Sequence, residues 1–329
     1  MKLTVLAAGA WGTALAIAFA RQHAVTLWSR ENDVVDAMRK DRENRRYLPG
    51  VALPTNLVVS GDLAGSLSNA ELLVVATPIV GLRGALADCA KFAPGIPVIW
   101  VCKGFEAGTG LLPHQVAEIC LTTATPYGVL SGPSFAQEVA AEKPTALSLA
   151  GNQPECFRDI AAALHGHHLR IYASEDMVGV EVGGAVKNVL AIATGVCDGL
   201  DLGLNARAAL MTRGLAEIAR LGAVLGAKRE TLMGLAGMGD LILTCTGDLS
   251  RNRRVGLELA AGKTLPQILE DLGHVAEGVP TALEVAAMAQ RLNVDMPISA
   301  AVASVLKGEV DVKTAVQALL ARDPRDELQ

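Results

Sequence analysis

The sequence is poor in aromatic residues and has no strong excess of either charge. Aromatic residues make up 3% of the chain, whereas alanine, valine and leucine are frequent, which fits a helix-rich or α/β protein. The formal net charge of −5 at pH 7 argues against a general surface for polyanions. We therefore expect no nucleic-acid partner, and we expect any phosphate binding to be local.

Metal-binding and targeting signals are also missing. The six cysteines form no C-x-x-C pair and show no spacing typical of metal ligands. We expect free thiols in a reducing cytoplasm and no metal site. The start of the chain has no basic leader with a cleavage site, and no apolar run reaches membrane-spanning length with suitable flanks. These features predict a soluble cytoplasmic protein that does not insert into membranes.

The alternation of strand and helix signals changes midway along the 329 residues. Up to Tyr172, continuous Val/Ile/Leu runs alternate with helical segments, which is typical of a parallel sheet covered on both faces. After Tyr172 only helical patterns remain. We predict an N-terminal Rossmann-like, doubly wound, mostly parallel sheet in residues 1–178 and an all-helical substrate domain in residues 179–329. The predicted strands are 3–7, 24–28, 72–76, 98–102, 128–130, 145–149 and 169–172, and the predicted C-terminal helices are 177–198, 205–224, 251–261, 265–272, 279–291, 297–306 and one from about 311.

A glycine turn joins the first strand to the first helix, predicted at 13–21. The order strand, glycine turn, helix, strand is that of a dinucleotide-binding unit, with the pyrophosphate at the helix N-terminus. Gly9 and Gly12 are present, but Ala7 occupies the position of the usual first glycine. If position 7 requires a positive φ, alanine costs roughly 1–2 kcal/mol there, whereas at negative φ it costs little. We expect weakened cofactor binding at this turn, which consists of Gly9, Ala10, Trp11 and Gly12.

The residues after the second strand bear on the choice of cofactor. An acidic side chain there binds the ribose 2′-hydroxyl of NADH, whereas arginine accommodates the 2′-phosphate of NADPH. Arg30 favours NADPH, but Glu31 follows directly and leaves NADH open. Arg30 as a solvated loop charge is the alternative.

Several chemically distinctive residues follow predicted strands directly. They are Gly9, Arg30, Thr77, Lys103 and the segment 131–136. Because ligands bind at the carboxyl ends of parallel strands, we expect these residues to lie along one edge of the sheet. Pro133 suits the first turn of a helix, which would direct the amides of Ser134 to Ala136 toward the ligand. Lys103 as a plain loop charge is the alternative.

Lys187 lies in the long apolar run from Met177 to Val196. Apolar residues on every face predict a helix that is buried all round. A buried ammonium group is costly unless something compensates it. Gly183 and Gly184 precede Lys187 on the face over which its side chain leans, and we expect them to leave room for a ligand. The alternative is a lysine whose stem is buried and whose amine reaches water.

Two further segments of the helical half carry chemistry. Residues 234–240 are too rich in glycine for a helix, so we expect Asp240 on a flexible turn. Ser250 is a natural N-cap for the helix that follows. Arg251, Arg253 and Arg254 in its first turns oppose the helix dipole, and a bound phosphate would resolve this conflict. The alternative is a basic surface patch.

These residues resemble those of the bacterial NAD(P)-dependent glycerol-3-phosphate dehydrogenases over nearly the whole chain. The motifs that carry the resemblance are AGAWGTALA, VCKGFE, SGPSFAQEVA, GVEVGGAVKNVLAIATG, LNARAALMTRGLAE, GLAGMGDLILTCTGDLSRNRR and VAEG. The resemblance implies reduction of dihydroxyacetone phosphate to sn-glycerol 3-phosphate by NADPH or NADH, which feeds glycerophospholipid synthesis. It also implies a homodimer. Ala7 departs from the family's usual glycine.

The resemblance also implies roles for individual residues. Lys187 would exchange the proton with the substrate oxygen, with Lys103 and Asp240 beside it. Because a free lysine with a pKa near 10.4 is too basic to accept a proton readily, we expect burial and the Lys103 charge to lower the pKa of Lys187. The implied substrate-binding residues are Lys103, Gly132, Ser134, Lys187, Asp240, Ser250, Arg251 and Asn252. The implied cofactor-binding residues, with the glycine turn, are Trp11, Arg30, Lys103, Ala136, Arg251, Val275 and Glu277.

Two other functions remain open at this point. A reductase of the β-hydroxyacid dehydrogenase type would share the buried lysine and the helical second domain, but it fits the arginine cluster and the glycine–aspartate segment less well. A non-catalytic NAD(P)-binding protein would account for the altered glycine turn. Oxidation of NADPH and NADH in the presence of dihydroxyacetone phosphate separates these alternatives.

Replacement of Arg251 by alanine tests the predicted phosphate site. We expect Arg251→Ala to raise the apparent KM for the phosphorylated substrate far more than the KM for a phosphate-free analogue, because only the former uses the guanidinium. Steady-state kinetics with both substrates measures the difference. Equal effects on both KM values would reject a phosphate-binding role.

Overall fold

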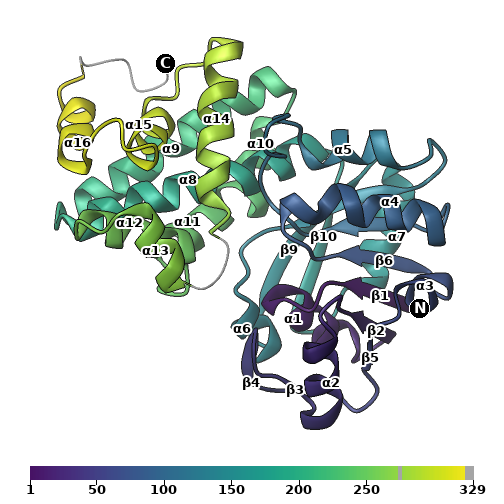
Figure 1. Cartoon of the computed structure of the whole chain (residues 1–329). Helices are drawn as coiled ribbons and strands as arrows, with labels where there is room; N and C mark the ends of the chain where they lie inside the picture. The colour runs from purple at the N-terminus through teal and green to yellow at the C-terminus, as the bar shows by residue number, and fades with distance from the viewer. Residues whose placement is uncertain (273–275, 323–329) are drawn as a thin grey trace.

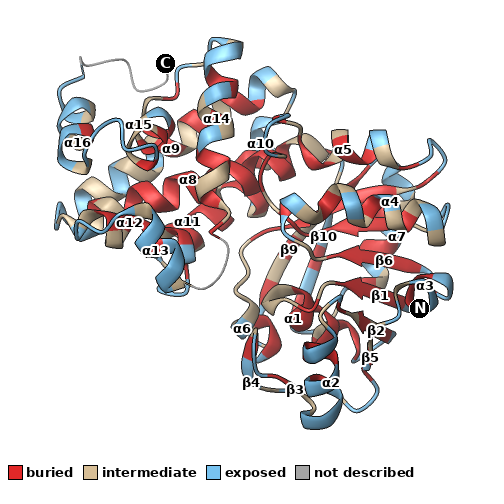
Figure 2. Ribbon diagram, viewed as in Figure 1, coloured by how far each residue is buried: buried red, intermediate tan, exposed pale blue. Residues whose placement is uncertain are grey.

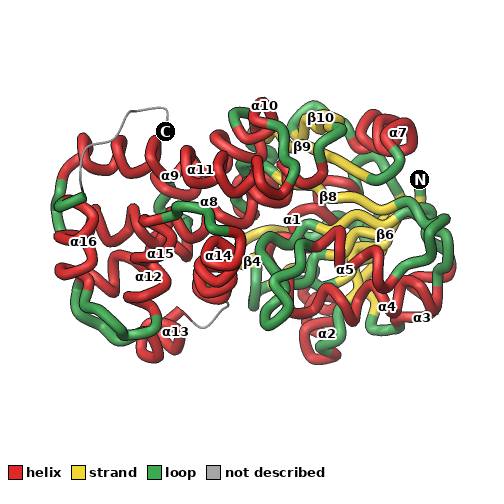
Figure 3. Tube along the Cα trace, turned by 90° about the horizontal axis from the view of Figure 1, so that it is seen from above, coloured by secondary structure: helices red, strands yellow, loops and turns green. Residues whose placement is uncertain are grey.

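The computed structural model describes residues 1–272 and 276–322. It divides into an α/β half and a helical half, which lie side by side with helix α8 at their junction (Figure 1). Seen from above, the strands are confined to the N-terminal half, whereas the other half consists of helices and loops (Figure 3). This arrangement confirms the predicted fold class.

The sheet of the N-terminal half has eight strands in the order β10-β9-β8-β7-β6-β1-β2-β5. The strands from β8 to β5 are parallel to one another, and β9 pairs with β8 in the antiparallel sense. Their bounds are β1 Lys2–Leu6, β2 Ala24–Trp28, β5 Val58–Ser60, β6 Leu72–Val75, β7 Val98–Trp100, β8 Tyr127–Ser131, β9 Thr145–Gly151 and β10 Leu169–Ser174. A separate pair is formed by β3 Glu43–Asn44 and β4 Leu48–Ala52.

Most of these strands lie within a few residues of the predicted ranges, but β3, β4 and β5 were not predicted. β5 has three residues and β4 contains Pro49 and Gly50, which are unfavourable in strands, so neither shows a clear strand pattern. The order of the sheet reverses between β1 and β6, since β2 lies on one side of β1 and β6 on the other. The carboxyl ends of β1 and β6 therefore flank the switch point at which such sheets bind ligands.

The helices of the N-terminal half cover the sheet, and those of the C-terminal half pack around α8. The first group is α1 Ala10–Phe19, α2 Asn32–Asp41, α3 Leu63–Ser68, α4 Leu82–Phe92, α5 Pro113–Cys120, α6 Ala136–Ala140 and α7 Pro154–Leu164, with a 3₁₀ turn η1 at Ile79–Gly81. The second is α8 Met177–Gly199, α9 Gly203–Leu225, α10 Arg229–Leu232, the π-helical turn η2 Leu235–Gly239, α11 Asp240–Thr246, α12 Arg251–Ala260, α13 Leu265–Leu272, α14 Gly278–Leu292, α15 Pro297–Leu306 and α16 Val312–Leu320.

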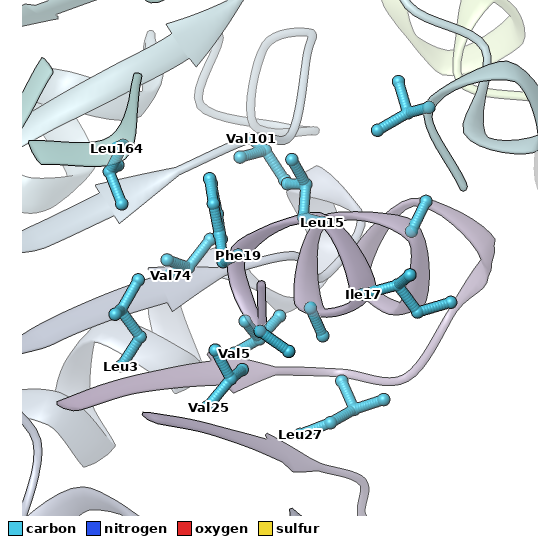
Figure 4. Close-up of a cluster of buried hydrophobic side chains, with 14 of the residues drawn as sticks. Leu3, Val5, Leu15, Ile17, Phe19, Val25, Leu27, Val74, Val101 and Leu164 are labelled. Atoms are coloured by element: carbon cyan, nitrogen blue, oxygen red, sulfur yellow. The ribbon is translucent and has the colours of Figure 1, made fainter. Parts of the chain in front are cut away.

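The core beneath α1 fixes the glycine turn to the sheet. Leu15 and Phe19 of α1 are at most 2% exposed and belong to one buried cluster with Val5 of β1 and Val74 of β6. Figure 4 shows these side chains between the helix and the strands. Burial of each such side chain stabilises the fold by about 1.5–3 kcal/mol, which holds the start of α1 above the carboxyl ends of the strands.

Helix α8 is buried along nearly its whole length, as its apolar pattern predicts. Every residue from Gly179 to Gly195 is buried, and the helix is red in the burial view (Figure 2). The helix is long and apolar enough to cross a membrane, but its most apolar 18-residue segment is entirely buried inside the protein. The helices packed on it include α9, α11, α12 and α14.

Candidate active site

The backbone of the glycine turn is strained at position 7, where the sequence alone could not decide the sign of φ. Ala7 has a φ of 85°, a region that favours glycine, and its amide donates to the carbonyl oxygen of Trp28 at 3.0 Å. A Cβ at Gly12 would lie 2.1 Å from the carbonyl oxygen of Ala7, so glycine is required at position 12. The methyl group of Ala7 therefore carries the cost of roughly 1–2 kcal/mol expected for a positive φ.

The start of α1 fits a dinucleotide pyrophosphate. Gly9 is the N-cap residue, its extended backbone carries no side chain, and no atom lies within 4 Å of where a Cβ would be. No side chain caps the first amides, and the first turn has no acidic residue, so the positive end of the helix is available to an anion. Ala10 and Trp11, the first two residues of α1, are partly exposed beside it.

Three charged side chains meet at the junction of the two halves. The Asp240 carboxylate accepts from Lys187 Nζ through Oδ1 and from Lys103 Nζ through Oδ2, each at 2.5 Å. Lys103 follows β7 in the N-terminal half, whereas Lys187 and Asp240 belong to the helical half. Lys187 is 6% exposed and Asp240 is 1% exposed. The structure thus brings together the three residues expected to form the catalytic group.

The environment of Lys187 suits proton exchange. Burial lowers its pKa to about 8; the Asp240 carboxylate opposes the change and the Lys103 ammonium adds to it. A lysine with this pKa is present in both protonation states near neutral pH, as a group that gives and accepts protons requires.

Asp240 lies on a helix, so the predicted flexible turn is wrong. Residues Leu235–Gly239 form a π-helical turn, and Asp240 is the first residue of α11. At this position the positive end of α11 stabilises its carboxylate. The glycines do not prevent helix formation because they permit close packing: a Cβ at Gly237 would lie 2.0 Å from the carbonyl oxygen of Leu232. Close packing of this turn, against Leu232 at Gly237 and against Gly183 of α8 at Ala236, here outweighs low intrinsic propensity.

The glycine pair before Lys187 does not leave space for a ligand. A Cβ at Gly183 would lie 2.7 Å from the carbonyl oxygen of Ala236 in η2. A Cβ at Gly184 would lie 2.8 Å from the hydroxyl of Ser131 and 3.6 Å from the stem of Lys103. The glycines instead let η2 and Lys103 approach α8. They thereby determine how close Lys103, and Asp240 at the end of η2, lie to Lys187.

The segment after β8 contributes oxygens near Lys103. The Gly132 carbonyl oxygen accepts from Lys103 Nζ at 3.4 Å and from the hydroxyl of Ser134 at 3.1 Å. Pro133 is not in the first turn of a helix, contrary to the prediction, because α6 begins at Ala136 with Phe135 as its N-cap. Gly132 has a φ of 144°, and α6 begins three residues after Pro133.

The predicted cluster of three arginines is reduced to one. Arg253 pairs with Asp198 at 2.8 Å and with Asp248 at 3.1 Å, and Arg254 lies 3.9 Å from Glu258. Carboxylates thus lie near both guanidinium groups, and closest to that of Arg253, whose partner Asp198 is too distant in the chain to be predicted from the local pattern. Arg251 is exposed and remains the candidate for phosphate binding.

Ser250 and Asn252 are buried and hold the start of α12. The hydroxyl of Ser250 accepts from the Arg253 amide at 3.2 Å, which confirms the predicted N-cap. The side-chain amide of Asn252 donates to Asn188 Oδ1 at 2.9 Å and accepts from the Gly278 amide at 3.0 Å. Asn252 therefore joins α12 to α8 and to the start of α14, and among the described residues one of its amide hydrogens has no acceptor and is available to a ligand.

Three of the remaining expected cofactor residues lie at the ends of β2, α6 and α14. Arg30 is exposed at the carboxyl end of β2, and Ala136 is half-buried at the start of α6. Glu277, the N-cap residue of α14, has a raised pKa because burial outweighs the opposing charges of Arg251, Lys103 and Lys187. Val275 lies outside the described residues.

Thr244 is a site residue that the sequence analysis missed. Its hydroxyl accepts from Lys187 Nζ at 2.7 Å and donates to the carbonyl oxygen of Asp240 at 2.7 Å. A helix over 240–246 would have placed Thr244 four residues from Asp240 on the same face, but that helix was not predicted. Within the described part of the chain, Lys187 donates to Asp240 and Thr244, which leaves one N–H for a substrate.

Comparison with known proteins identifies the family. The family models for the N-terminus and the C-terminus of NAD-dependent glycerol-3-phosphate dehydrogenase match residues 2–157 and 176–317. The chain belongs to this family. It is 66% identical to the glycerol-3-phosphate dehydrogenase [NAD(P)+] of Dechloromonas aromatica, with all of both chains covered. The crystal structure of the Coxiella burnetii glycerol-3-phosphate dehydrogenase is similar, with a TM-score of 0.93 at 44% identity, and covers 98% of this chain and 99% of its own.

The strained alanine of this family member gives a direct test. We expect Ala7→Gly to stabilise the protein by about 1 kcal/mol, because removal of the methyl group relieves the positive-φ strain. We also expect tighter NAD(P)H binding, measured by cofactor fluorescence, with stability measured by denaturant unfolding.

The neighbouring Ala8 provides the control for this substitution. Ala8 is 3% exposed and is not among the positive-φ residues, so Ala8→Gly should destabilise the protein. If Ala7→Gly destabilised the protein as Ala8→Gly does, strain at position 7 would be refuted.

Proposed function

We propose that this chain reduces dihydroxyacetone phosphate to sn-glycerol 3-phosphate, reversibly, with NADH or NADPH as the cofactor. The observation that carries the proposal is the buried Lys187, whose ammonium contacts Asp240 at the junction of the two halves. Membership of the glycerol-3-phosphate dehydrogenase family supports the choice of reaction. When bound, the dihydronicotinamide cofactor would supply the hydride.

Lys187 acts as the proton donor in this proposal. As negative charge develops on the carbonyl oxygen of the substrate, the free N–H of Lys187 protonates it. Asp240 and Thr244 orient the ammonium by accepting its other two hydrogens. Lys103 contacts the other carboxylate oxygen of Asp240. Its positive charge lies near the carbonyl oxygen of the substrate and lowers the pKa of Lys187. In the reverse direction neutral Lys187 accepts the proton.

The remaining site residues bind substrate and cofactor. We assign the phosphate group to Arg251, Ser250 and Asn252 at the start of α12, where helix amides and a guanidinium favour an anion. Gly132 and Ser134 complete the substrate site beside Lys103. The proposed cofactor contacts are Gly9, Ala10, Trp11, Gly12, Arg30, Lys103, Ala136, Arg251, Val275 and Glu277.

The proposal extends to the domains, the location and the assembly of the chain. Residues 1–178 form the dinucleotide-binding domain and residues 179–329 the substrate domain of a cytoplasmic protein that binds neither membranes nor nucleic acids. We expect a homodimer, and the apolar side chains of Leu202 and Leu204, which are 41% and 71% exposed at the start of α9, offer a surface for a second copy. Analytical ultracentrifugation tests this: a purely monomeric species at micromolar concentration would refute it.

Replacement of the proposed proton donor tests the mechanism. We expect Lys187→Met to leave cofactor binding intact and to lower kcat by about 10²–10⁴-fold, because methionine cannot donate a proton. In the parent protein, the rate of ketone reduction should fall as the pH rises through about 8, whereas the rate of alcohol oxidation should rise. The measurement is NAD(P)H absorbance with dihydroxyacetone phosphate as substrate.

A surface lysine provides the control for this experiment. Lys263 pairs with Glu258 and Asp271 at the surface and is not one of the proposed site residues, so Lys263→Met should retain turnover. Substantial turnover by Lys187→Met, or a pH dependence unchanged by it, would remove Lys187 from the proposed role.

A further inference from the structure

A second buried polar cluster lies on α8, away from Lys187. Glu181 is 4% exposed, and its carboxylate accepts three hydrogen bonds from the N-terminal half. Oε1 accepts from Trp100 Nε1 at 3.1 Å and from the His114 amide at 2.9 Å, and Oε2 lies 2.5 Å from His114 Nδ1. The proposed mechanism uses none of these groups.

The three residues connect the elements that carry the two lysines. Trp100 ends β7, and Lys103 follows three residues later. Glu181 lies on α8, six residues before Lys187. The bond between Trp100 and Glu181 therefore ties the strand that leads to Lys103 directly to the helix that carries Lys187. His114 adds the start of α5, where its amide is one of the helix N-terminal donors that lack an intrahelical partner.

We propose that Glu181 is a positioning residue, which holds the Lys187 helix in register with Lys103 through its bonds to Trp100 and His114. It touches neither substrate nor cofactor. Its effect on the rate arises because proton transfer depends steeply on the position of the donor, and a displacement of about 1 Å can cost about 10²-fold in rate. This inference rests on the proposed role of Lys187.

The charges of His114 and Glu181 support the positioning role of the contact between them. Burial opposes protonation of His114, but the hydrogen bond and the charge of Glu181 outweigh burial and raise the pKa of the imidazole. Burial likewise raises the pKa of Glu181, and the contacts with His114 and Trp100 partly offset the change. The titratable groups around the pair are Glu118 on α5, Tyr127 on β8 and Cys102 after β7.

The direction of the pH effect follows from the raised pKa of His114. Protonated His114 contributes stability that is fully present below its unfolded value of 6.5 and is lost as the pH rises through the folded value. The contact between His114 and Glu181 is therefore strongest below pH 6.5, and it weakens as the pH rises through the raised pKa of His114.

Alanine and glutamine variants of Glu181 separate positioning from general destabilisation. We expect Glu181→Ala to lower kcat by about tenfold or more, with KM for both substrates changed by less than about threefold, because the donor is misplaced but the binding groups remain. Glu181→Gln should recover most of kcat, since its oxygen can accept from the same two N–H groups.

Glu217 provides a matched control in the helical half. It is 1% exposed and accepts from the amides of Ile298 and Ser299 and from the hydroxyl of Ser299. Glu217→Ala also removes a buried carboxylate with three donors, so it should lower the thermal midpoint while kcat of the folded protein stays within about twofold. Equal losses of kcat in Glu217→Ala and Glu181→Ala would overturn the proposal.

A spectroscopic measurement keeps the proposal testable even if Glu181→Ala fails to fold. Ring NMR of ¹⁵N-histidine-labelled protein follows His114, with His114→Asn assigning its signal. We expect its titration midpoint above 6.5 in the parent protein and below 6.5 in Glu181→Gln, where burial is no longer offset by the carboxylate charge. A midpoint at or below 6.5 in the parent protein would overturn the proposal independently of turnover and of the role of Lys187.

Discussion

The arrangement at the domain junction depends on one carboxylate between two ammonium groups. Removing a charged amine from water costs several kcal/mol, and here two amines approach each other within an apolar environment. Asp240 makes this possible because each of its oxygens faces a different lysine at 2.5 Å. Without it, Lys103 and Lys187 would repel each other, and the two halves of the chain would lose their closest polar contact at the site.

The close packing of backbone against backbone brings that carboxylate into place. Gly183 meets the carbonyl group of Ala236, and Gly237 meets that of Leu232, at distances that a side chain would prevent. The π-helical turn is thereby pressed against α8 and delivers Asp240 one residue later. Glycine in this protein thus acts by permitting contact, and rigid elements hold the charged groups.

The sequence predicted the elements well where a periodic pattern was long, and poorly where packing decided. The parallel strands, α8 and the N-cap at Ser250 follow from local hydrophobicity and capping chemistry, so their positions were accessible. The helix at Asp240, the partners of Arg253 and the role of Gly183 depend on segments that are distant in the chain. Lys187, Lys103 and Asp240 could be selected as site residues from their residue types. The contacts of Asp240 with both lysines could not be predicted, because they depend on how the two halves of the chain pack against each other. Glu181 stands out in the sequence as a carboxylate in the same apolar run as Lys187, but its contact with His114 could not be predicted, since nothing in either local pattern indicates the other.

The charges at the junction do not cancel, and this has a consequence for encounter with the substrate. Lys103, Lys187 and Arg251 face Asp240 and Glu277, which leaves an excess of one positive charge in a chain whose formal net charge is −5. A phosphorylated metabolite approaching the surface at random meets mostly repulsion, whereas the field at the junction draws it inward. The field at the junction then favours arrival there, and raising the ionic strength reduces both the repulsion and the attraction.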